Sequence, residues 1–122
     1  MTTSDRRFPA AVYRHGDEPD ARFSLANERT FLAWIRTALA LLAGGVALEV
    51  LGLDLHPQLR LAASLVLVIS AVLTSALAWS SWMRTERALR LNAPLPPSLL
   101  GPFLGVAVTA AGLLVLLSVV LR

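Results

Sequence analysis

The chain has 122 residues, of which 56% are hydrophobic, and its mean hydropathy is +0.65. Soluble domains average roughly 45–50% apolar residues, so this composition excludes an ordinary soluble domain and predicts one small helical membrane domain. The lack of cysteine excludes disulfides, thiolate metal sites and thiol nucleophiles. The 11 basic residues are all arginine and exceed the eight acids by three. The exclusive use of arginine has two interpretations. It reflects the composition of a GC-rich genome, or it serves the bidentate binding of phosphate by guanidinium groups.

Residues 1–20 are polar, contain Pro9 and Pro19 and show no apolar periodicity, which predicts a flexible cytoplasmic tail. No apolar core follows the basic start, so we expect no cleaved secretory signal. The first spanning helix would then be the targeting element. A three-span membrane domain is expected over residues 21–122.

The first predicted span, residues 30–53, is long enough at roughly 36 Å to cross a bilayer core. It carries Arg36 about two turns inside the apolar run and Glu49 near the far end, although a charge at mid-membrane costs roughly 2.5–3.5 kcal/mol. Ser24 or Asn27 could cap a break in the helix before the membrane. The two charged residues within the span require an explanation.

Two further apolar runs predict the remaining spans. Residues 61–83 follow a polar turn that contains Pro57, and residues 99–121 follow a proline-rich segment. Both runs are long enough to cross a bilayer. The expected fold class is therefore an all-α membrane protein with three transmembrane helices.

The distribution of arginine predicts the orientation. Nine arginines fall on the side of the N-terminus and the second loop, whereas only Arg60 and Arg122 fall on the other side. By the positive-inside rule, the N-terminus is expected to be cytoplasmic and the C-terminus outside. We therefore expect a multi-pass membrane protein with this orientation.

A ladder of arginines is predicted on the first helix. Arg22, Arg29 and Arg36 recur every seven positions, so their side chains lie roughly 10 Å apart on one face if the helix is continuous. Small residues fall within about 80° of this ladder, and a small-residue stripe in lipid is where another helix approaches. The small residues are Ala33, Thr37, Ala40, Gly44 and Ala47.

The other two spans extend the same pattern. On the second helix, Arg84 lies on the side of the small residues and Arg87 points toward lipid headgroups. The third span carries Gly101, Gly105 and Gly112 on one narrow face, including a GxxxG spacing. Because every span carries a small-residue face, the chain is expected to form a homo-oligomer.

Two alternatives compete with an anion-handling function. The arginines could simply set the topology and contact anionic lipid phosphates, as in an accessory membrane subunit. Glu49 could serve a small cation or drug exporter, although it lies near the outer end and could snorkel to the surface. Catalytic residues, metal ligands, cofactors and nucleic-acid partners are not expected, because no base, phosphate-loop or ligand pattern is present.

The run ANERTFLAWIRTAL, residues 26–39, resembles the bacterial YidH-type family known as domain of unknown function 202. This family is similar to the membrane domain of the vacuolar transporter chaperone subunits. The later run WMRTERALR resembles the basic cluster that follows the second span. The resemblance implies domains assembled around a pore that conducts polyphosphate, with basic residues at its cytoplasmic entrance, and it places Arg22, Arg29 and Arg84 there.

Two departures limit this resemblance. The chain lacks the soluble polymerising domains of the chaperone subunits, so synthesis of polyphosphate is not implied. Arg36 stands where those subunits carry an uncharged polar residue. The sequence therefore predicts a small oligomer whose cytoplasmic mouth binds or conducts phosphate-rich anions, through Arg22, Arg29, Arg36 and Arg84.

Overall fold

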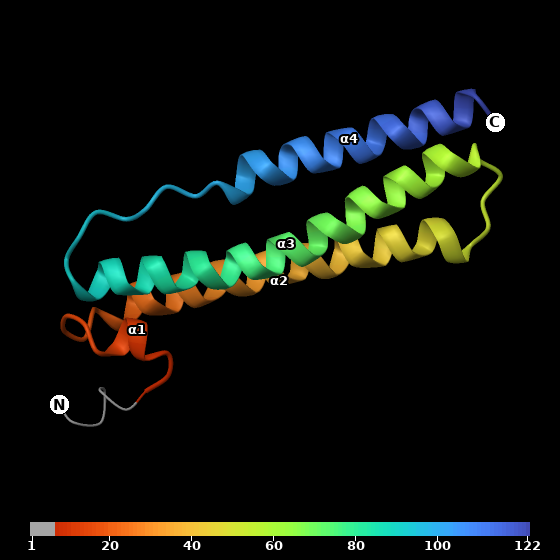
Figure 1. Ribbon diagram of the computed structural model, residues 1–122. Coiled ribbons are helices and arrows are strands. Elements are labelled where there is room, and N and C mark those ends of the chain that lie inside the picture. The colour runs from red at the N-terminus through yellow and green to blue at the C-terminus, as the bar shows by residue number, and fades with distance from the viewer. Residues whose placement is uncertain (1–6) are drawn as a thin grey trace.

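The computed structural model describes residues 7–122 and is helical over that range, with no strand. A single turn of helix, α1 (Ala10–Tyr13), precedes three long helices: α2 (Ala21–Val50), α3 (Pro57–Arg90) and α4 (Leu100–Val120) (Figure 1). Each long helix is apolar enough and long enough to span a membrane. The predicted all-α fold with three spans is confirmed, whereas the orientation of the termini stays a prediction.

The first long helix begins earlier than its apolar run and is continuous. Asp20 caps it, because its carboxylate accepts a hydrogen bond of 2.9 Å from the backbone N–H of Arg22. Ser24 and Asn27 lie inside α2 and cap no break. The helix therefore carries its polar N-terminal turns into the apolar part without interruption.

The second long helix extends past its apolar run at both ends. His56 caps its N-terminus, with Nδ1 accepting from the backbone N–H of Leu59 at 3.4 Å, and Pro57 occupies the first turn. At the other end, α3 continues to Arg90, and Asn92 then adopts a positive φ of 55°. The predicted span 61–83 is thus the apolar middle of a 34-residue helix.

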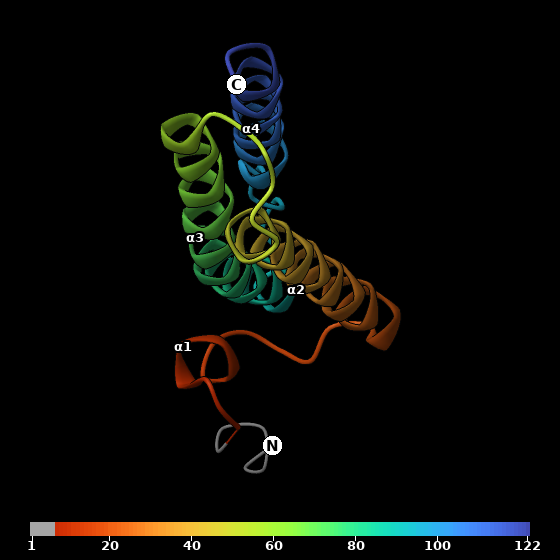
Figure 2. The ribbon, with the colours of Figure 1, turned by 90° about the vertical axis from the view of Figure 1, so that its right-hand side faces the viewer.

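The three helices form an open, angled arrangement with α3 between the other two. In Figure 2, α2 and α4 lie along different sides of α3 and diverge from one another. A small core of Leu41, Ala71 and Leu104, one residue from each long helix, joins them near the middle. The protomer is therefore a shallow assembly in which α2 and α4 each present an unpartnered face.

α2 and α3 approach one another closely at Gly45. The Ser64 hydroxyl donates a 2.7 Å hydrogen bond to the Gly45 carbonyl, and a Cβ on Gly45 would lie only 2.7 Å from Val68 Cγ2. Its neighbour Gly44, which the sequence placed on the packing stripe, is half-buried, and an added Cβ there would meet Leu67 at an ordinary 3.6 Å. Between the long helices of the protomer, Gly45 is the glycine that permits close packing.

The segment before α2 is folded where the sequence predicted a flexible tail. Of that predicted tail, residues 1–6 lie outside the described residues, but residues 8–18 pack against the C-terminal end of α3. Val12 is 1% exposed, and Gly16 has a φ of 63° and touches the backbone of Arg90. Contacts between residues this far apart in the chain leave no local periodicity, which explains the difference.

Candidate functional site

The predicted arginine ladder lies on the face of α2 that turns away from α3. Asn27 and Ala38 are buried against α3. Arg29 is two residues after Asn27, and Arg36 is two residues before Ala38. Two residues correspond to about 200° around a helix. Both arginines are exposed, and neither forms a salt bridge with another residue of 7–122. Because α2 is continuous, the two guanidinium groups share one face, roughly 10 Å apart along the axis.

Arg22 differs from the other two members of the ladder because it has an acidic partner. Its Nη2 lies 2.9 Å from Asp20 Oδ2, and its Nε also contacts the same carboxylate. This hydrogen-bonded pair lowers the pKa of Asp20. The Asp20 carboxylate therefore offsets much of the positive charge that Arg22 adds to the ladder.

Within one protomer, Arg84 is not brought together with the ladder. Glu86 faces α2, and Arg84 precedes it by two residues, so Arg84 points to the opposite side of α3. Arg84 and Arg87 are both exposed. A cluster that contains Arg29, Arg36 and Arg84 would have to form between copies of the chain.

A buried polar cluster joins α2 to α3 beside the ladder. The carboxylate of Glu86, which is 4% exposed, accepts hydrogen bonds from the Ser24 hydroxyl at 2.6 Å and from the Asn27 amide at 3.1 Å. The same amide group also donates to the Trp82 carbonyl at 3.1 Å. This cluster sets the rotation of α2 and thereby directs Arg29 away from α3.

Sequence reasoning missed this cluster. Its signal was present, because Asn27 belongs to the run ANERTFLAW and Glu86 belongs to the run WMRTERALR. A single carboxylate among several arginines does not by itself indicate a buried acid. The pairing becomes visible only when α2 and α3 are packed together.

Arg90 is not available to an anion, although it belongs to the same basic cluster as Arg84. Its side chain is 2% exposed and donates to the carbonyls of Tyr13 and His15 and to the Glu18 carboxylate. Arg7 also pairs with Glu18, and the two arginines lower the pKa of that carboxyl group. Arg90 therefore has a structural role.

The acid at the far end of the first span also has a partner. Glu49 Oε1 lies 3.5 Å from Arg60 Nε, and Arg60 Nη1 donates to the Leu53 carbonyl at 2.8 Å. Glu49 lies near the end of α2, and Arg60 lies in the first turn of α3. The two charges offset one another at that end of the bundle.

The predicted packing residues form faces that remain open in the protomer. A Cβ added at Gly101, Gly105 or Gly112 would meet no atom within 4 Å. On α2, Ala33 and Ala40 are exposed, whereas Thr37, Gly44 and Ala47 are half-buried. None of these residues provides the close helix contact within the protomer, which Gly45 and Ser64 supply instead.

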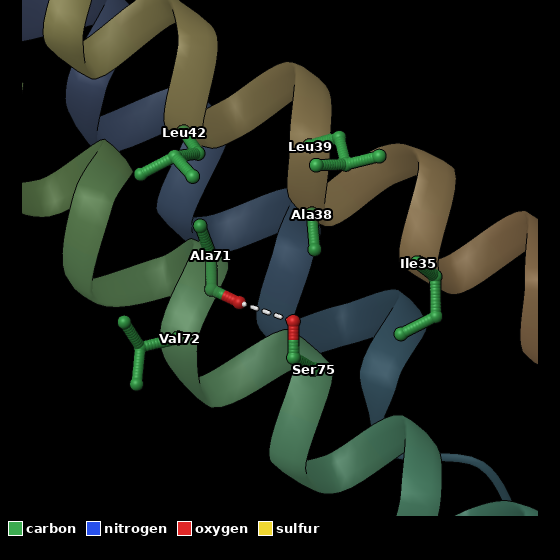
Figure 3. A pocket seen from close by; sticks show the side chains of 7 residues that line it. All are labelled: Ile35, Ala38, Leu39, Leu42, Ala71, Val72 and Ser75. Atoms are coloured by element: carbon green, nitrogen blue, oxygen red, sulfur yellow. Dashed lines mark hydrogen bonds between the residues drawn. The ribbon is translucent and has the colours of Figure 1, made fainter.

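The pocket between α2 and α3 is apolar. It has a volume of about 140 Å³ and opens on a side of α2 away from the ladder (Figure 3). Its only hydroxyl, on Ser75, already donates to the Ala71 carbonyl at 3.1 Å. The residues that line it are Ile35, Ala38, Leu39, Leu42, Ala71, Val72 and Ser75. This pocket suits a hydrocarbon group and offers nothing to an anion.

Residues 7–122 contain no group of three or more His, Cys, Asp or Glu side chains placed to hold a metal ion. The expectation that the chain uses neither a metal nor a cofactor stays an expectation. The chemistry that the arrangement does offer is the binding of anions by exposed guanidinium groups.

Comparison with known proteins gives a consistent result. Residues 22–88 match the family described as "Domain of unknown function (DUF202)". The chain is 46% identical to the uncharacterized protein Rv2272 of Mycobacterium tuberculosis over 106 residues, which is 86% of this chain and 87% of that protein. It is 48% identical to the inner membrane protein YidH of Escherichia coli over 86 residues, 70% of this chain and 75% of that protein. No solved structure matches the chain.

Proposed function

This chain belongs to the DUF202 family and is a small multi-pass protein of the inner membrane, and from that premise we propose that several copies surround an arginine-lined opening that binds phosphate-rich anions. The opening faces the cytoplasm in the predicted orientation. The observation that carries the proposal is the exposure of Arg29 and Arg36 on the face of α2 opposite α3.

The position of Arg36 is the first argument. It lies about two turns inside the apolar run, where a guanidinium group facing acyl chains costs roughly 2.5–3.5 kcal/mol. No other helix of the same protomer covers this face. A second copy, approaching over the small residues Ala33 and Ala40, would enclose the charge in a polar interior.

The chemistry of guanidinium is the second argument. A planar guanidinium group binds phosphate oxygens through paired hydrogen bonds, and rings of arginine select anions in pores. Repetition of Arg29 and Arg36 by each subunit would give two stacked rings in a low-dielectric mouth. Such rings would attract phosphate, polyphosphate or another phosphate-rich anion, and conduction would follow only if binding remains weak enough for release.

Arg22 and Arg84 have lesser parts in this proposal. Arg22 forms a salt bridge with Asp20 at the outer edge of the mouth. Arg84 points away from α2 within its own protomer, so it would contribute only across a subunit boundary. The main contribution to binding is therefore assigned to Arg29 and Arg36.

An accessory membrane subunit that holds anionic lipid is the second candidate. The exposure of Arg29, Arg36 and Arg84 on a single protomer favours it, because these side chains would meet lipid phosphates if no copies associate. An exporter that works through Glu49 is less well supported, since Arg60 already pairs with that carboxylate.

The experiment measures the binding of radiolabelled phosphate and polyphosphate, and their flux, with the purified protein in liposomes of neutral lipid. Replacing Arg29 or Arg36 with Ala should weaken binding and reduce flux, and added salt should weaken binding by the wild type. Arg122→Ala is the matched control, because it removes an exposed arginine from the opposite end of the bundle. Equal binding by all four proteins would refute the anion mouth. Binding of anionic lipid, without binding or flux of phosphate or polyphosphate, would favour the accessory subunit.

The number of copies is a separate requirement. Three helices cannot enclose an opening, so the detergent-purified particle should contain several copies by native mass measurement. A strictly monomeric particle would contradict the proposed function whatever its affinity for anions.

A further inference from the structure

Residues 7–18, the N-terminal strap, are folded along the outside of the C-terminal third of α3 (Figure 1). At one end of the strap, Gly16 lies directly on the end of α3. A side chain at Gly16 would collide with the Arg90 carbonyl group, and the backbone N–H of Asp17 donates to that carbonyl at 3.0 Å. Glycine also allows the positive φ of 63° at this position.

Arg90 secures this end of the strap. Its guanidinium group donates to the carbonyls of His15 at 2.7 Å and Tyr13 at 3.2 Å and to Glu18 at 2.9 Å. The buried cation thereby has three acceptors, all from the strap. Because a buried unpaired guanidinium group is strongly unfavourable, these contacts fix the strap against α3.

The other end of the strap lies deeper along the bundle. The Phe8 ring stacks on Trp79 with 6.2 Å between ring centroids. Trp79 precedes Arg90 by about three turns of α3, which is roughly 16 Å toward the middle of the apolar run. The strap therefore descends along α3 from the level of Gly16 to the level of Phe8.

Aromatic rings gather at this level. Trp79 also stacks on Trp82, with a centroid distance of 5.3 Å, and meets the Phe31 ring edge-on at 6.1 Å. Trp79 and Trp82 lie at the end of the apolar run of α3, where tryptophan marks the boundary between acyl chains and headgroups. Phe8 is thus placed at the depth of the membrane interface.

The outward surface of the strap has the composition of an interfacial segment. Phe8 is 82% exposed, although it is a large apolar side chain. Arg7 precedes it and pairs with Glu18, with its guanidinium group 4.3 Å from the centroid of the Tyr13 ring, and Arg14 is exposed directly after Tyr13. An apolar ring flanked by arginines is typical of segments that lie in the plane of a bilayer surface.

We propose that the N-terminal strap is an interfacial membrane anchor, in which Phe8 inserts at the acyl-chain boundary and the docking of Gly16 and Arg90 on α3 holds it at that depth. The partner is the lipid surface that surrounds the bundle. The anchor does not depend on anion binding by the α2 ladder.

The test measures the depth of single labels. Because the chain contains no cysteine, Phe8→Cys and Asp17→Cys each carry one environment-sensitive fluorophore. In liposomes whose lipids are brominated along the acyl chains, the label at position 8 should show blue-shifted emission and a large loss of intensity. The label at position 17, which lies at the exposed end of the strap, should show neither change.

Two outcomes at position 8 would overturn the proposal. Emission as in water would place the strap outside the membrane, and blue-shifted emission without quenching would show that protein, such as a second copy of the chain, covers Phe8. Gly16→Leu in the Phe8→Cys protein should release the strap from α3 and abolish the quenching. Quenching that persists in this variant would contradict the role of α3 in setting the depth.

Discussion

The two ends of the bundle hold their charged side chains in different ways. At the end where the strap docks, the side chains of Glu86 and Arg90 are buried, and each is hydrogen-bonded to groups on another segment of the chain. At the opposite end, Glu49 and Arg60 form one partly exposed pair at 3.5 Å. Because buried, hydrogen-bonded charges constrain the segments that carry them, the strap end fixes the rotation and depth of its helices, and the opposite end does not.

The same comparison explains which arginines remain available. At the strap end, the buried cluster directs Arg29 and Arg36 away from α3, so their charges lie on an open face. At the opposite end, the single pair offsets both charges. A binding function is therefore expected at the strap end, where Arg29 and Arg36 share one face of α2 and form no salt bridge with another residue of 7–122.

Glu86→Ala should produce the largest loss of stability. It leaves the Ser24 hydroxyl and the Asn27 amide as buried donors without their acceptor, which should lower the free energy of unfolding by about 3 kcal/mol. Glu86→Gln keeps an acceptor and should lose about 1 kcal/mol. Denaturant unfolding in detergent micelles measures both. Equal losses for Glu86→Ala and Glu49→Ala would remove the contrast between the two ends.

Gly45→Val should lower the stability by about 2 kcal/mol, because the added side chain meets Val68 and the Ser64 carbonyl at the closest helix contact. Gly105→Val is the matched control, since open space surrounds that residue within the protomer. The control should unfold like the wild type and should reduce the number of associated copies, as judged by native mass measurement. If Gly105→Val unfolds the protomer instead, the α4 face is not an open packing surface.

Acid should release the strap without unfolding the long helices. The pKa of Glu18 is lowered from 4.5 by hydrogen bonds from Arg7 and Arg90, so its contribution is fully present above pH 4.5. That contribution is lost as the pH falls below 4.5 through the lower pKa of the folded protein. The protection factors of residues 8–18, which correct hydrogen exchange for the intrinsic effect of pH, should therefore fall in this range, and in Glu18→Gln they should be independent of pH there. An unchanged pH dependence in Glu18→Gln would assign the effect to another group.

Glu49→Gln should produce the smallest effect, about 0.5 kcal/mol, because the pair with Arg60 is partly exposed. Thermal unfolding in micelles measures it. A loss as large as that of Glu86→Ala would show that the opposite end is as closely specified as the strap end.

The fold was largely predictable because membrane spans have a strong local signal. A continuous apolar run of the right length suffices to indicate each helix, and α2, α3 and α4 lie where the three runs are. The ends were less predictable, since the polar turns before Thr30 and after Met83 carry no apolar signal. They are helical because Asp20 and the packing of Glu86 and Arg90 stabilise them.

The candidate site was predictable in part. The seven-residue spacing placed Arg29 and Arg36 on one face, and α2 does present them so. The sequence did not indicate that Asp20 binds Arg22, that Arg84 points away from α2, or that Arg90 is buried under the strap. The direction of Arg84 and the burial of Arg90 depend on the rotation of one segment against another, which side-chain periodicity along a single helix does not encode. The Asp20–Arg22 pair is local and depends on where α2 begins.

The amino-acid sequence alone determined that the chain is helical, that it has three spans, and that arginines concentrate at one end, because length and hydropathy act locally along the chain. The tertiary structure decided which charges are buried and which remain exposed. A buried charge requires hydrogen-bonding partners, and here these lie on segments that are distant in the sequence. Glu86 accepts from the Asn27 amide, and Arg90 donates to the His15 carbonyl.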